Sequence, residues 1–277
     1  MNNYNNKKQI VFENIKDFDL AETFECGQCF RWNPRNNGYE GVSCGKEAHV
    51  NISNGNLIIS VLEENPDKEF WEKYFDVNLD YQKVKDEIKD IHPVLKEACK
   101  YAPGIRILNQ EPWETLCSFI ISQNNNIPRI KGIIHRLCEI FGEKIENNYS
   151  FPSAEKIALL SEEDLKPLRC GFRVPYILDA AKKVSNREVD LLSLKNLPLE
   201  DARKELIKIH GVGPKVAECT LLYGLHRLDA FPIDVWMKKI MNKFFKNESP
   251  QIFGRFAGIA QQYLFHYIRM NPKLLEE

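Results

Sequence analysis

A lysine and an aspartate, nineteen positions apart, are the residues whose types and setting best suit covalent chemistry. Residues 203–223 read RKELIKIHGVGPKVAECTLLY, so that Lys215 follows directly after a proline. Proline favours the first turn of a helix, where its missing N–H is not needed, and Lys215 is therefore predicted beside the positive end of a helix dipole. Positive potential and desolvation favour the neutral amine of a lysine, a nucleophile that can attack carbon.

The aspartate belongs to the stretch Phe231-Pro232-Ile233-Asp234-Val235, where the next helix is expected to begin. Aspartate is a preferred N-cap residue, so capping alone would explain Asp234. Its carboxylate could also orient a ribose or carry a proton beside Lys215. An amine and a carboxylate at one site suit a displacement at the C1′ carbon of a sugar.

The residues around the lysine predict a helix-hairpin-helix. Residues 206–209 fit a short first helix, Gly211-Val212-Gly213 fits a tight turn, and Pro214 starts a second helix. Two glycines let the backbone approach a phosphate closely, and free N–H groups at the start of the second helix point toward it. Such a site binds the DNA backbone without reading its sequence, although an ordinary helical turn would also explain the glycines alone.

The elements that must position these residues change along the chain. Asn54-Gly55 lies between two runs of alternating polar and apolar residues, which predicts a hairpin because both turn residues need positive φ. An earlier strand is predicted at residues 28–32. From about residue 66, apolar residues recur at helical spacing. The fold class is therefore α+β, with a small N-terminal antiparallel β domain (1–95) and a larger all-α region (96–277).

The composition of the 277 residues is that of an ordinary globular protein, with 43% hydrophobic and 28% charged residues. No apolar run approaches the ~18–20 residues of a transmembrane helix. The N-terminal segment MNNYNNKKQIVFENI lacks the apolar core of a secretory signal. We therefore expect a cytoplasmic protein with no membrane partner.

The eight cysteines are scattered and mostly lie in apolar stretches, where a reduced thiol packs as a small hydrophobe. Cys26 and Cys29 form a C-x-x-C pair, which could serve redox chemistry or supply half of a zinc site. No second pair of this kind follows, so we expect neither a disulfide framework nor a metal site of this type.

Charge is distributed unevenly, although the formal net charge is only −1. Residues 1–100 carry 13 Lys or Arg and 18 Asp or Glu, whereas residues 166–215 carry 11 and 6. The positive excess around the hairpin fits a surface that faces phosphates. Solvated helix faces would explain a bias of this size equally well.

Further stretches, in a fixed order, accompany the hairpin and the lysine. They are 27–32 (GQCFRW), 118–127 (SFIISQNNNI), 171–173 (GFR), 211–219 (GVGPKVAEC) and 260–265 (AQQYLF). Together they resemble the helix-hairpin-helix glycosylase superfamily and, more closely, the 8-oxoguanine DNA glycosylase/AP lyase family, over most of the chain. The resemblance implies a monomeric, bifunctional enzyme of base excision repair that removes 8-oxoguanine from double-stranded DNA, in a cleft between two subdomains of the α region.

The resemblance assigns the chemistry to Lys215 and Asp234. The amine of Lys215 would attack C1′ and displace the base, and the resulting Schiff base would undergo the β-elimination that nicks the strand. Asp234 would assist these steps. Either residue can reach the nucleotide only after the base has been flipped out of the duplex, which costs a few kcal/mol.

The resemblance also implies residues that replace the flipped base and read its partner. Phe172 would fill the gap as a wedge, and its setting between Gly171 and Arg173 argues against a core position. Asn124, Arg129 and Arg173 would contact the estranged cytosine and impose a preference for cytosine opposite the lesion. A solvent loop would explain the run of three asparagines equally well.

For the damaged base, the resemblance implies a pocket that includes both parts of the chain. The main-chain carbonyl of Gly27 would accept the N7–H that distinguishes 8-oxoguanine from guanine. Cys219 and Phe265 would sandwich the purine, and Gln261 would bind its Watson–Crick edge. On the residues alone, core packing explains Cys219 and Phe265 as readily.

The hairpin would hold the DNA backbone through the main chain of Gly211, Val212 and Gly213. In the superfamily it often binds a monovalent cation, here through the main chain of Ile207, Ile209 and Val212. No cofactor is required, and no C-terminal four-cysteine cluster is present to hold an iron–sulfur cluster.

Three residues depart from the family pattern. His210 stands where a proline is common, Trp236 replaces a histidine often used on a backbone phosphate, and Pro175 stands where animal enzymes tend to carry an arginine. These departures bear on individual phosphate contacts and not on the chemistry.

Two alternative functions remain at this point. A glycosylase for another lesion, such as an alkylated purine, is disfavoured because monofunctional relatives keep the aspartate and lack the lysine. A non-catalytic DNA-binding module would use the hairpin alone, and Lys215→Gln would then cause no chemical defect. Borohydride trapping of a protein–DNA adduct separates an enzyme of the Lys215 type from such a module.

Overall fold

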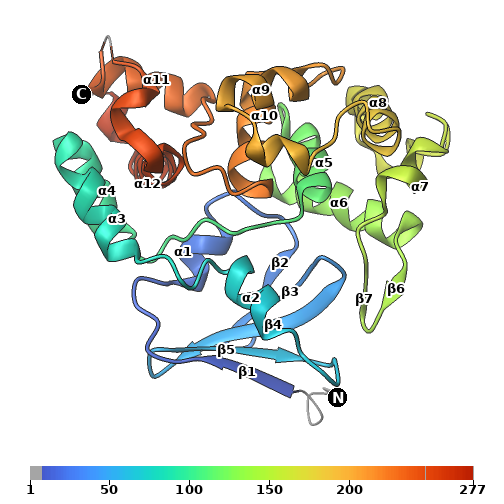
Figure 1. Ribbon diagram of the computed structural model, residues 1–277, viewed down its shortest axis with the longest axis horizontal. Helices are drawn as coiled ribbons and strands as arrows, with labels where there is room; N and C mark the ends of the chain where they lie inside the picture. Colours follow the sequence, from blue (N-terminus) through green and yellow to red (C-terminus); the bar gives the residue numbers. More distant parts are fainter. Residues whose placement is uncertain (1–7, 247, 277) are drawn as a thin grey trace.

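The computed structural model describes residues 8–246 and 248–276, and its strands and helices occupy separate parts of the molecule. Figure 1 shows the strands β1 to β5 together on one side and the helices from α3 onward on the other. The predicted α+β class, with an antiparallel sheet followed by a helical region, is confirmed.

The sheet has five antiparallel strands in the order β1-β5-β4-β3-β2. They are β1 (Lys8–Phe12), β2 (Trp32–Arg35), β3 (Gly38–Ser43), β4 (Lys46–Ser53) and β5 (Asn56–Val61). The predicted hairpin is confirmed, because Asn54 and Gly55 join β4 to β5 with φ of 51° and 74°. These are the positive values that a two-residue turn needs to match the twist of its strands.

The strand predicted from residue 28 is wrong for residues 28–31, which lie outside β2. The buried side chain of Gln28 explains the difference, since its Nε2 donates to the carbonyls of Thr23 (2.9 Å) and Arg106 (2.7 Å). Its Oε1 accepts from the N–H of Leu108 at 2.9 Å. The loop is therefore anchored to a distant segment of the chain instead of to a neighbouring strand.

Alternation along β5 buries one face of the sheet. Leu57, Ile59 and Val61 are fully buried and share a core with Trp71 of α2 (Lys68–Tyr74). A short helix, α1 (Leu20–Phe24), closes this core, and Phe24 stacks on Trp32 with 4.7 Å between the ring centroids.

The helical region consists of helices that bury one face and are separated by short turns. They are α3 (Tyr81–Ile88), α4 (Pro93–Tyr101), α5 (Pro112–Ser122), α6 (Ile127–Phe141), α7 (Ala154–Ala158), α8 (Val174–Ser185), α9 (Leu199–Ile207), α10 (Pro214–Cys219), α11 (Val235–Phe244) and α12 (Ala257–Met270). A small hairpin, β6 (Lys144–Ile145) with β7 (Asn148–Tyr149), follows α6. A π-helical turn, Thr220–Gly224, extends α10. Within the described residues, no helix is long and apolar enough to cross a membrane.

Short 3-10 turns connect these helices. They are Lys89–Ile91, Lys166–Leu168, Gly171–Arg173, Ser193–Asn196, Pro250–Phe256 and Pro272–Leu275.

The helices form two groups. Helix α12 packs on α4 and α11, whereas α10 packs on α5 and α9. Figure 1 shows α3, α4, α11 and α12 on one side and α5 to α10 on the other. The first group thus combines helices from before and after the second group in the sequence, and the segment between α10 and α11 joins the two groups.

The loop at residues 26–30 packs against both parts of the chain. Cys26 and Phe30 belong to the helical core, whereas Cys29 belongs to the core of the sheet, which also includes Leu108. The predicted domain boundary at residue 95 stays a prediction. The two cores nevertheless meet at this loop, so the sheet domain cannot move freely relative to the helices.

Seven of the eight cysteines are buried, and all are free thiols. Burial raises the pKa of Cys26, Cys99 and Cys138 to about 12 and that of Cys219 to about 11, from an ordinary value of 9.0. As the pH rises through 9, the unfolded chain therefore releases these protons while the folded protein keeps them. Stability that is present below pH 9 is lost above it.

We expect the free energy of unfolding under reducing conditions to fall between pH 9 and about 11, by up to about 1.4 kcal/mol per pH unit for each such thiol. Urea titrations across this range would measure the effect. Cys138→Ala should show a shallower decline than the parent protein. A free energy that stays constant from about pH 8 to 11 would contradict the prediction.

Candidate active site

The helix-hairpin-helix is formed by α9, a tight turn and α10. The N–H of Val212 donates to the carbonyl of Ile209 at 3.0 Å and closes the turn. Gly211 has φ of 79°, and a Cβ atom added there would lie 2.3 Å from the ring of Tyr176. Gly213 has an extended backbone (φ −97°, ψ −179°) and open space where a Cβ would point. The first glycine is therefore required by internal packing, whereas the second leaves room for a partner.

Lys215 lies in the first turn of α10 with its side chain half-buried. Its Nζ is 3.4 Å from Oγ of Ser122, the last residue of α5, and 4.8 Å from the centroid of the Phe119 ring. Within residues 8–246 and 248–276, no carboxylate oxygen lies within 4.0 Å of this Nζ. An ion pair would hold the amine in its charged form, so the absence of one here suits a nucleophile.

Asp234 and Cys219 are the other titratable residues of the candidate site. Asp234 is the N-cap of α11, and its Oδ1 accepts from the N–H of Met237 at 2.8 Å. Cys219 is buried one turn after Lys215. Burial raises the pKa of the Cys219 thiol, the charge of Lys215 opposes this rise, and the charge of Asp234 adds to it. The charges of the amine and of the carboxylate therefore both reach the same buried thiol.

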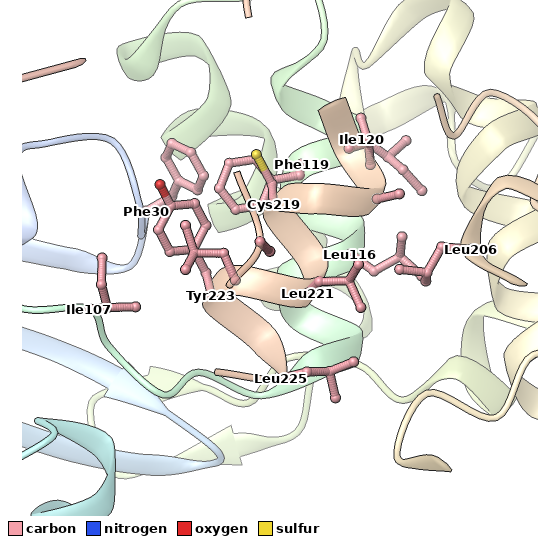
Figure 2. Packing of buried hydrophobic residues seen from close by; sticks show 14 of the residues in the cluster. Phe30, Ile107, Leu116, Phe119, Ile120, Leu206, Cys219, Leu221, Tyr223 and Leu225 are labelled. Atoms are coloured by element: carbon pink, nitrogen blue, oxygen red, sulfur yellow. The ribbon is translucent and has the colours of Figure 1, made fainter. Parts of the chain in front are cut away.

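Aromatic rings from three elements pack around this cluster. Phe119 of α5 stacks on Tyr223 with 5.4 Å between the ring centroids, and Phe30 meets Phe119 edge-on at 5.8 Å. Figure 2 shows these rings beside Cys219, with Phe30 reaching in from the N-terminal loop. The sheet domain thus contributes directly to the environment of the amine.

Gln261 of α12 presents an unused hydrogen-bond acceptor. Its side chain is 4% exposed, and its Oε1 has no hydrogen-bond partner among the described residues. The next residue, Gln262, donates through Nε2 to the carbonyl of Cys26 at 3.2 Å. A buried acceptor without a donor is costly in a folded protein, so this site suits a ligand that carries N–H groups. The bond from Gln262 keeps Gly27 close to α12.

Phe265 lies one turn after Gln261 and is half-buried. The guanidinium of Arg269 lies 5.7 Å from the centroid of its ring. A Cβ atom added to Gly27, whose φ is 91°, would lie 3.9 Å from the same guanidinium. Gly27 and Phe265 therefore share Arg269 as a neighbour, and the structure brings the predicted base-binding residues from the two parts of the chain together.

The asparagine run forms the connection between α5 and α6. Asn124 is exposed with φ of 47°, and Asn126 caps α6 by accepting from the N–H of Arg129 at 3.0 Å. The side chain of Arg129 is exposed in the first turn of the helix. Asn126 therefore has a structural role as the N-cap of α6, and this role by itself accounts for an asparagine at that position.

Phe172 is 54% exposed in the 3-10 turn, as expected for a residue outside the core. Arg173 is only 2% exposed, and its guanidinium donates to the carbonyls of Gln123, Asn124 and Cys170. It therefore holds the asparagine loop against the 3-10 turn. Burial, and secondarily the charge of Arg129, lower the pKa of Arg173.

Two family models cover most of the chain. The 8-oxoguanine DNA glycosylase N-terminal domain matches residues 10–116, and the HhH-GPD superfamily base excision DNA repair protein matches residues 117–251. The N-glycosylase/DNA lyase of Saccharomyces cerevisiae is 34% identical over 83% of this chain and 69% of its own length. The chain belongs to the 8-oxoguanine DNA glycosylase/AP lyase family. It is a DNA N-glycosylase with DNA lyase activity.

Solved structures agree with this assignment. The 8-oxoguanine glycosylase/lyase of Clostridium acetobutylicum, in complex with double-stranded DNA containing cytosine opposite 8-oxoG, is 36% identical with a TM-score of 0.88. The match covers 96% of this chain and 97% of that one. MBOgg1, in complex with a low-affinity DNA ligand, is 42% identical with a TM-score of 0.90, over 95% of this chain and 96% of that one.

Sequence reasoning missed several residues of this glycosylase that touch the site. Ser122 and Phe119 contact the amine of Lys215, and Arg269 adjoins Gly27. The stretch that contains Ser122 is one of the family motifs, but nothing in its spacing indicates that α5 meets α10. Within the described part of the chain, no group of three or more His, Cys, Asp or Glu side chains is arranged to hold a metal ion.

The two glycines of the hairpin give a matched test of the DNA contact. Gly211→Ala combines a positive φ with a clash against Tyr176, so we expect a loss of stability of about 1–3 kcal/mol. Gly213→Ala should fold with unchanged stability but bind abasic-site DNA more weakly, because its new methyl group points into open space at the turn. Thermal unfolding and fluorescence anisotropy measure the two effects. Equal DNA affinity for Gly213→Ala and the parent glycosylase would show that no phosphate approaches this glycine.

Proposed function

We propose that this glycosylase excises 8-oxoguanine from duplex DNA, preferentially opposite cytosine, by base flipping, attack of Lys215 on C1′, Schiff-base formation and β-elimination. The proposal rests mainly on one observation, the half-buried amine of Lys215, which has no ion-pair partner in the described chain and lies one turn before the buried Cys219. Its relatives named as 8-oxoguanine glycosylase/lyase support the choice of lesion.

The chemistry follows from the two groups. The nitrogen of Lys215 forms a bond to C1′ while the C1′–N9 bond breaks, and the base leaves with the electron pair and takes up a proton. Loss of the amine proton and opening of the sugar ring give the Schiff base. Removal of a C2′ proton then expels the 3′ phosphate. The carboxylate of Asp234 stabilises the positive charge that develops at the sugar and assists the proton transfers.

The proposed recognition of the base uses groups from three elements. Guanine and 8-oxoguanine both carry N–H donors at N1 and N2, which suit the unpartnered Oε1 of Gln261. Discrimination must therefore come from N7–H, which only the lesion carries and which the carbonyl of Gly27 would accept. Cys219 and Phe265 would cover the two faces of the purine.

The opposite strand would meet the wedge and the asparagine loop. The exposed ring of Phe172 would fill the gap left by the flipped base, and Asn124 would contact the estranged cytosine. Arg129 is exposed and can reach the acceptor edge of cytosine. Arg173 donates to backbone carbonyls, so it would have to exchange one of these bonds to read the base.

The hairpin would bind the phosphate backbone through Gly211, Val212 and Gly213. The open space beside Gly213 fits a close approach of the phosphate. A monovalent cation held by the main chain of Ile207, Ile209 and Val212 would add positive charge there without taking part in catalysis. We also propose that the enzyme acts as a monomer.

Helix α11 supplies a second basic surface, which begins at Asp234. Helix α11 carries Lys238, Lys239 and Lys243, and Lys246 follows the end of the helix. No Asp or Glu lies between residues 235 and 246. Other lysines pair with an acid three residues earlier, as Lys100 does with Glu97 at 2.8 Å. None of the α11 lysines has such an ion pair within the described ranges. An uncompensated row of lysines next to the site fits the phosphates of one DNA strand.

Replacement of Lys239 and Lys243 by glutamine should weaken binding to abasic-site DNA and lower the slope of log K against log salt by about 1 for each lysine–phosphate interaction removed. Anisotropy titrations between about 50 and 200 mM salt would measure the slope. Lys100→Gln is the matched control, since Lys100 already has its own acid, and should leave the slope unchanged. The same slope in all variants would reject the α11 surface.

A panel of duplexes tests the proposed activity, with 8-oxoguanine opposite each of the four bases and guanine opposite cytosine. We expect the fastest single-turnover excision with 8-oxoguanine opposite cytosine. Lys215→Gln should lower the rate by about three orders of magnitude or more and abolish the borohydride-trapped adduct. Arg129→Ala should reduce the differences in excision rate among the four bases placed opposite 8-oxoguanine. Cleavage of 8-oxoguanine no faster than guanine would reject the proposed substrate.

A further inference from the structure

A buried carboxylate lies directly behind the proposed nucleophile. Glu218 follows Lys215 by three residues on α10, and its side chain is only 5% exposed. Its Oε1 accepts from Nε of Arg203 on α9 at 2.5 Å, and its Oε2 accepts from the backbone N–H of Phe231 at 2.6 Å. Both oxygens of this buried charge are therefore satisfied, as they must be for a carboxylate in the interior.

The bond to Phe231 fixes the segment that leads to Asp234. Phe231 stacks on Phe253 with 5.1 Å between the ring centroids and 8° between the rings. Pro232 is buried and has a fixed φ, and two residues later Asp234 caps α11. Three residues span at most about 10 Å, so a fixed Phe231 leaves Asp234 little freedom to move.

The same carboxylate is rigidly connected to Lys215. Residues three apart on a helix are neighbours on one face. Lys215 and Glu218 both line a cavity of about 750 Å³, together with Arg203, Phe231 and Ile233. Neither Gly27 nor Gln261 lines this cavity, which therefore lies outside the proposed base-binding residues. Glu218 thus connects the helix that carries the amine to the segment that carries the aspartate.

We propose that Glu218, held by Arg203, is a positioning residue that sets the place of Asp234 relative to Lys215. The inference rests on the proposed function, because it assigns Glu218 a role through Asp234. Arg203 is itself paired with Glu200, so α9 presents it in a fixed orientation. A displacement of about 1 Å between reacting groups can lower a rate roughly 100-fold, so a clamp of this kind affects catalysis as well as stability.

A double-mutant cycle separates positioning from simple stabilisation. Glu218→Ala removes the acceptor for Phe231 and should lower the single-turnover rate of 8-oxoguanine excision roughly 10- to 100-fold, with unchanged affinity for abasic-site DNA. Glu218→Gln retains one acceptor and should recover part of the rate. In an Asp234→Asn background, Glu218→Ala should lower the single-turnover rate by less than about threefold, because the residue that Glu218 positions has already been disabled.

Glu114 provides the matched control. It is a partly buried carboxylate on a helix beside the site, with a side chain that is 15% exposed, and it pairs with Arg31 at 3.2 Å. Glu114→Gln should lower the unfolding temperature but reduce the rate by the same factor in the parent and in the Asp234→Asn background. If Glu218→Ala also lowers the rate by equal factors in both backgrounds, the positioning role is rejected. A Glu218→Ala variant with the parent rate rejects it as well.

Two further measurements keep the test decisive. If Glu218→Ala does not fold, the cycle is run with Glu218→Gln and Arg203→Lys, and the same non-additivity is expected. Borohydride trapping on abasic-site DNA, with no base to excise, reports the reaction of Lys215 independently of the lesion. A parent enzyme that traps abasic DNA but leaves 8-oxoguanine intact would reject the proposed substrate, and the cycle on the trapping rate would still decide the role of Glu218.

Discussion

Two acidic residues, Glu218 and Asp234, belong to the elements around Lys215, and each of them accepts hydrogen bonds from other donors. Glu218 accepts from Arg203 and from the backbone of Phe231, while Asp234 accepts from the N–H of Met237. In a half-buried site the attraction between an ammonium and a free carboxylate would be strong, and an ion pair would remove the nucleophile. The amine contacts a hydroxyl and an aromatic ring, neither of which carries a charge. The candidate site depends on this arrangement, in which both carboxylates bond to other donors and leave the amine without an ion pair.

Buried hydrogen bonds also explain how the N-terminal loop of the sheet domain is held against the candidate site. Gln28 uses two buried hydrogen bonds to hold the N-terminal loop on the segment that enters the helical region, and a third bond connects it to Thr23 of α1. Gln262 attaches the loop to α12 from the other side, through the carbonyl of Cys26. Its neighbour Gln261 is left with an unpartnered oxygen. Of two adjacent glutamines on one helix, one therefore completes the fold and the other is available to a ligand.

The features that sequence reasoning predicted are those whose causes are local. The Asn54-Gly55 hairpin and the start of α10 at Pro214 follow from conformational preferences of a few adjacent residues. The strand expected at residues 28–31 is absent because Gln28 bonds to residues about 80 positions away, and no periodicity records such a partner. The pairing of Arg203 with Glu218 was missed for a related reason: both residues are visible in the sequence, but only the packing of α9 on α10 brings them together.

Arg173 shows how a residue can be found by its motif and still have unexpected surroundings. Its position in the short stretch 171–173 suggests an exposed group that reads a base, yet its guanidinium is buried among three carbonyls. A buried guanidinium with several backbone acceptors is a strong organiser of loops, because it has five donors in a fixed plane. Its bonds therefore hold the asparagine loop against the 3-10 turn that carries Phe172.

One departure from the family pattern, His210, also has a local physical reason. The N–H of His210 donates to Oδ2 of Asp179 on α8 at 2.7 Å, a bond that a proline could not make. The ring of His210 meets Tyr176 edge-on at 4.8 Å, and Tyr176 in turn meets Phe172 at 6.0 Å. Tyr176 is also the ring that excludes any side chain at Gly211. A continuous row of aromatic contacts therefore connects the turn of the hairpin with the exposed ring of Phe172, and these residues form one packed unit.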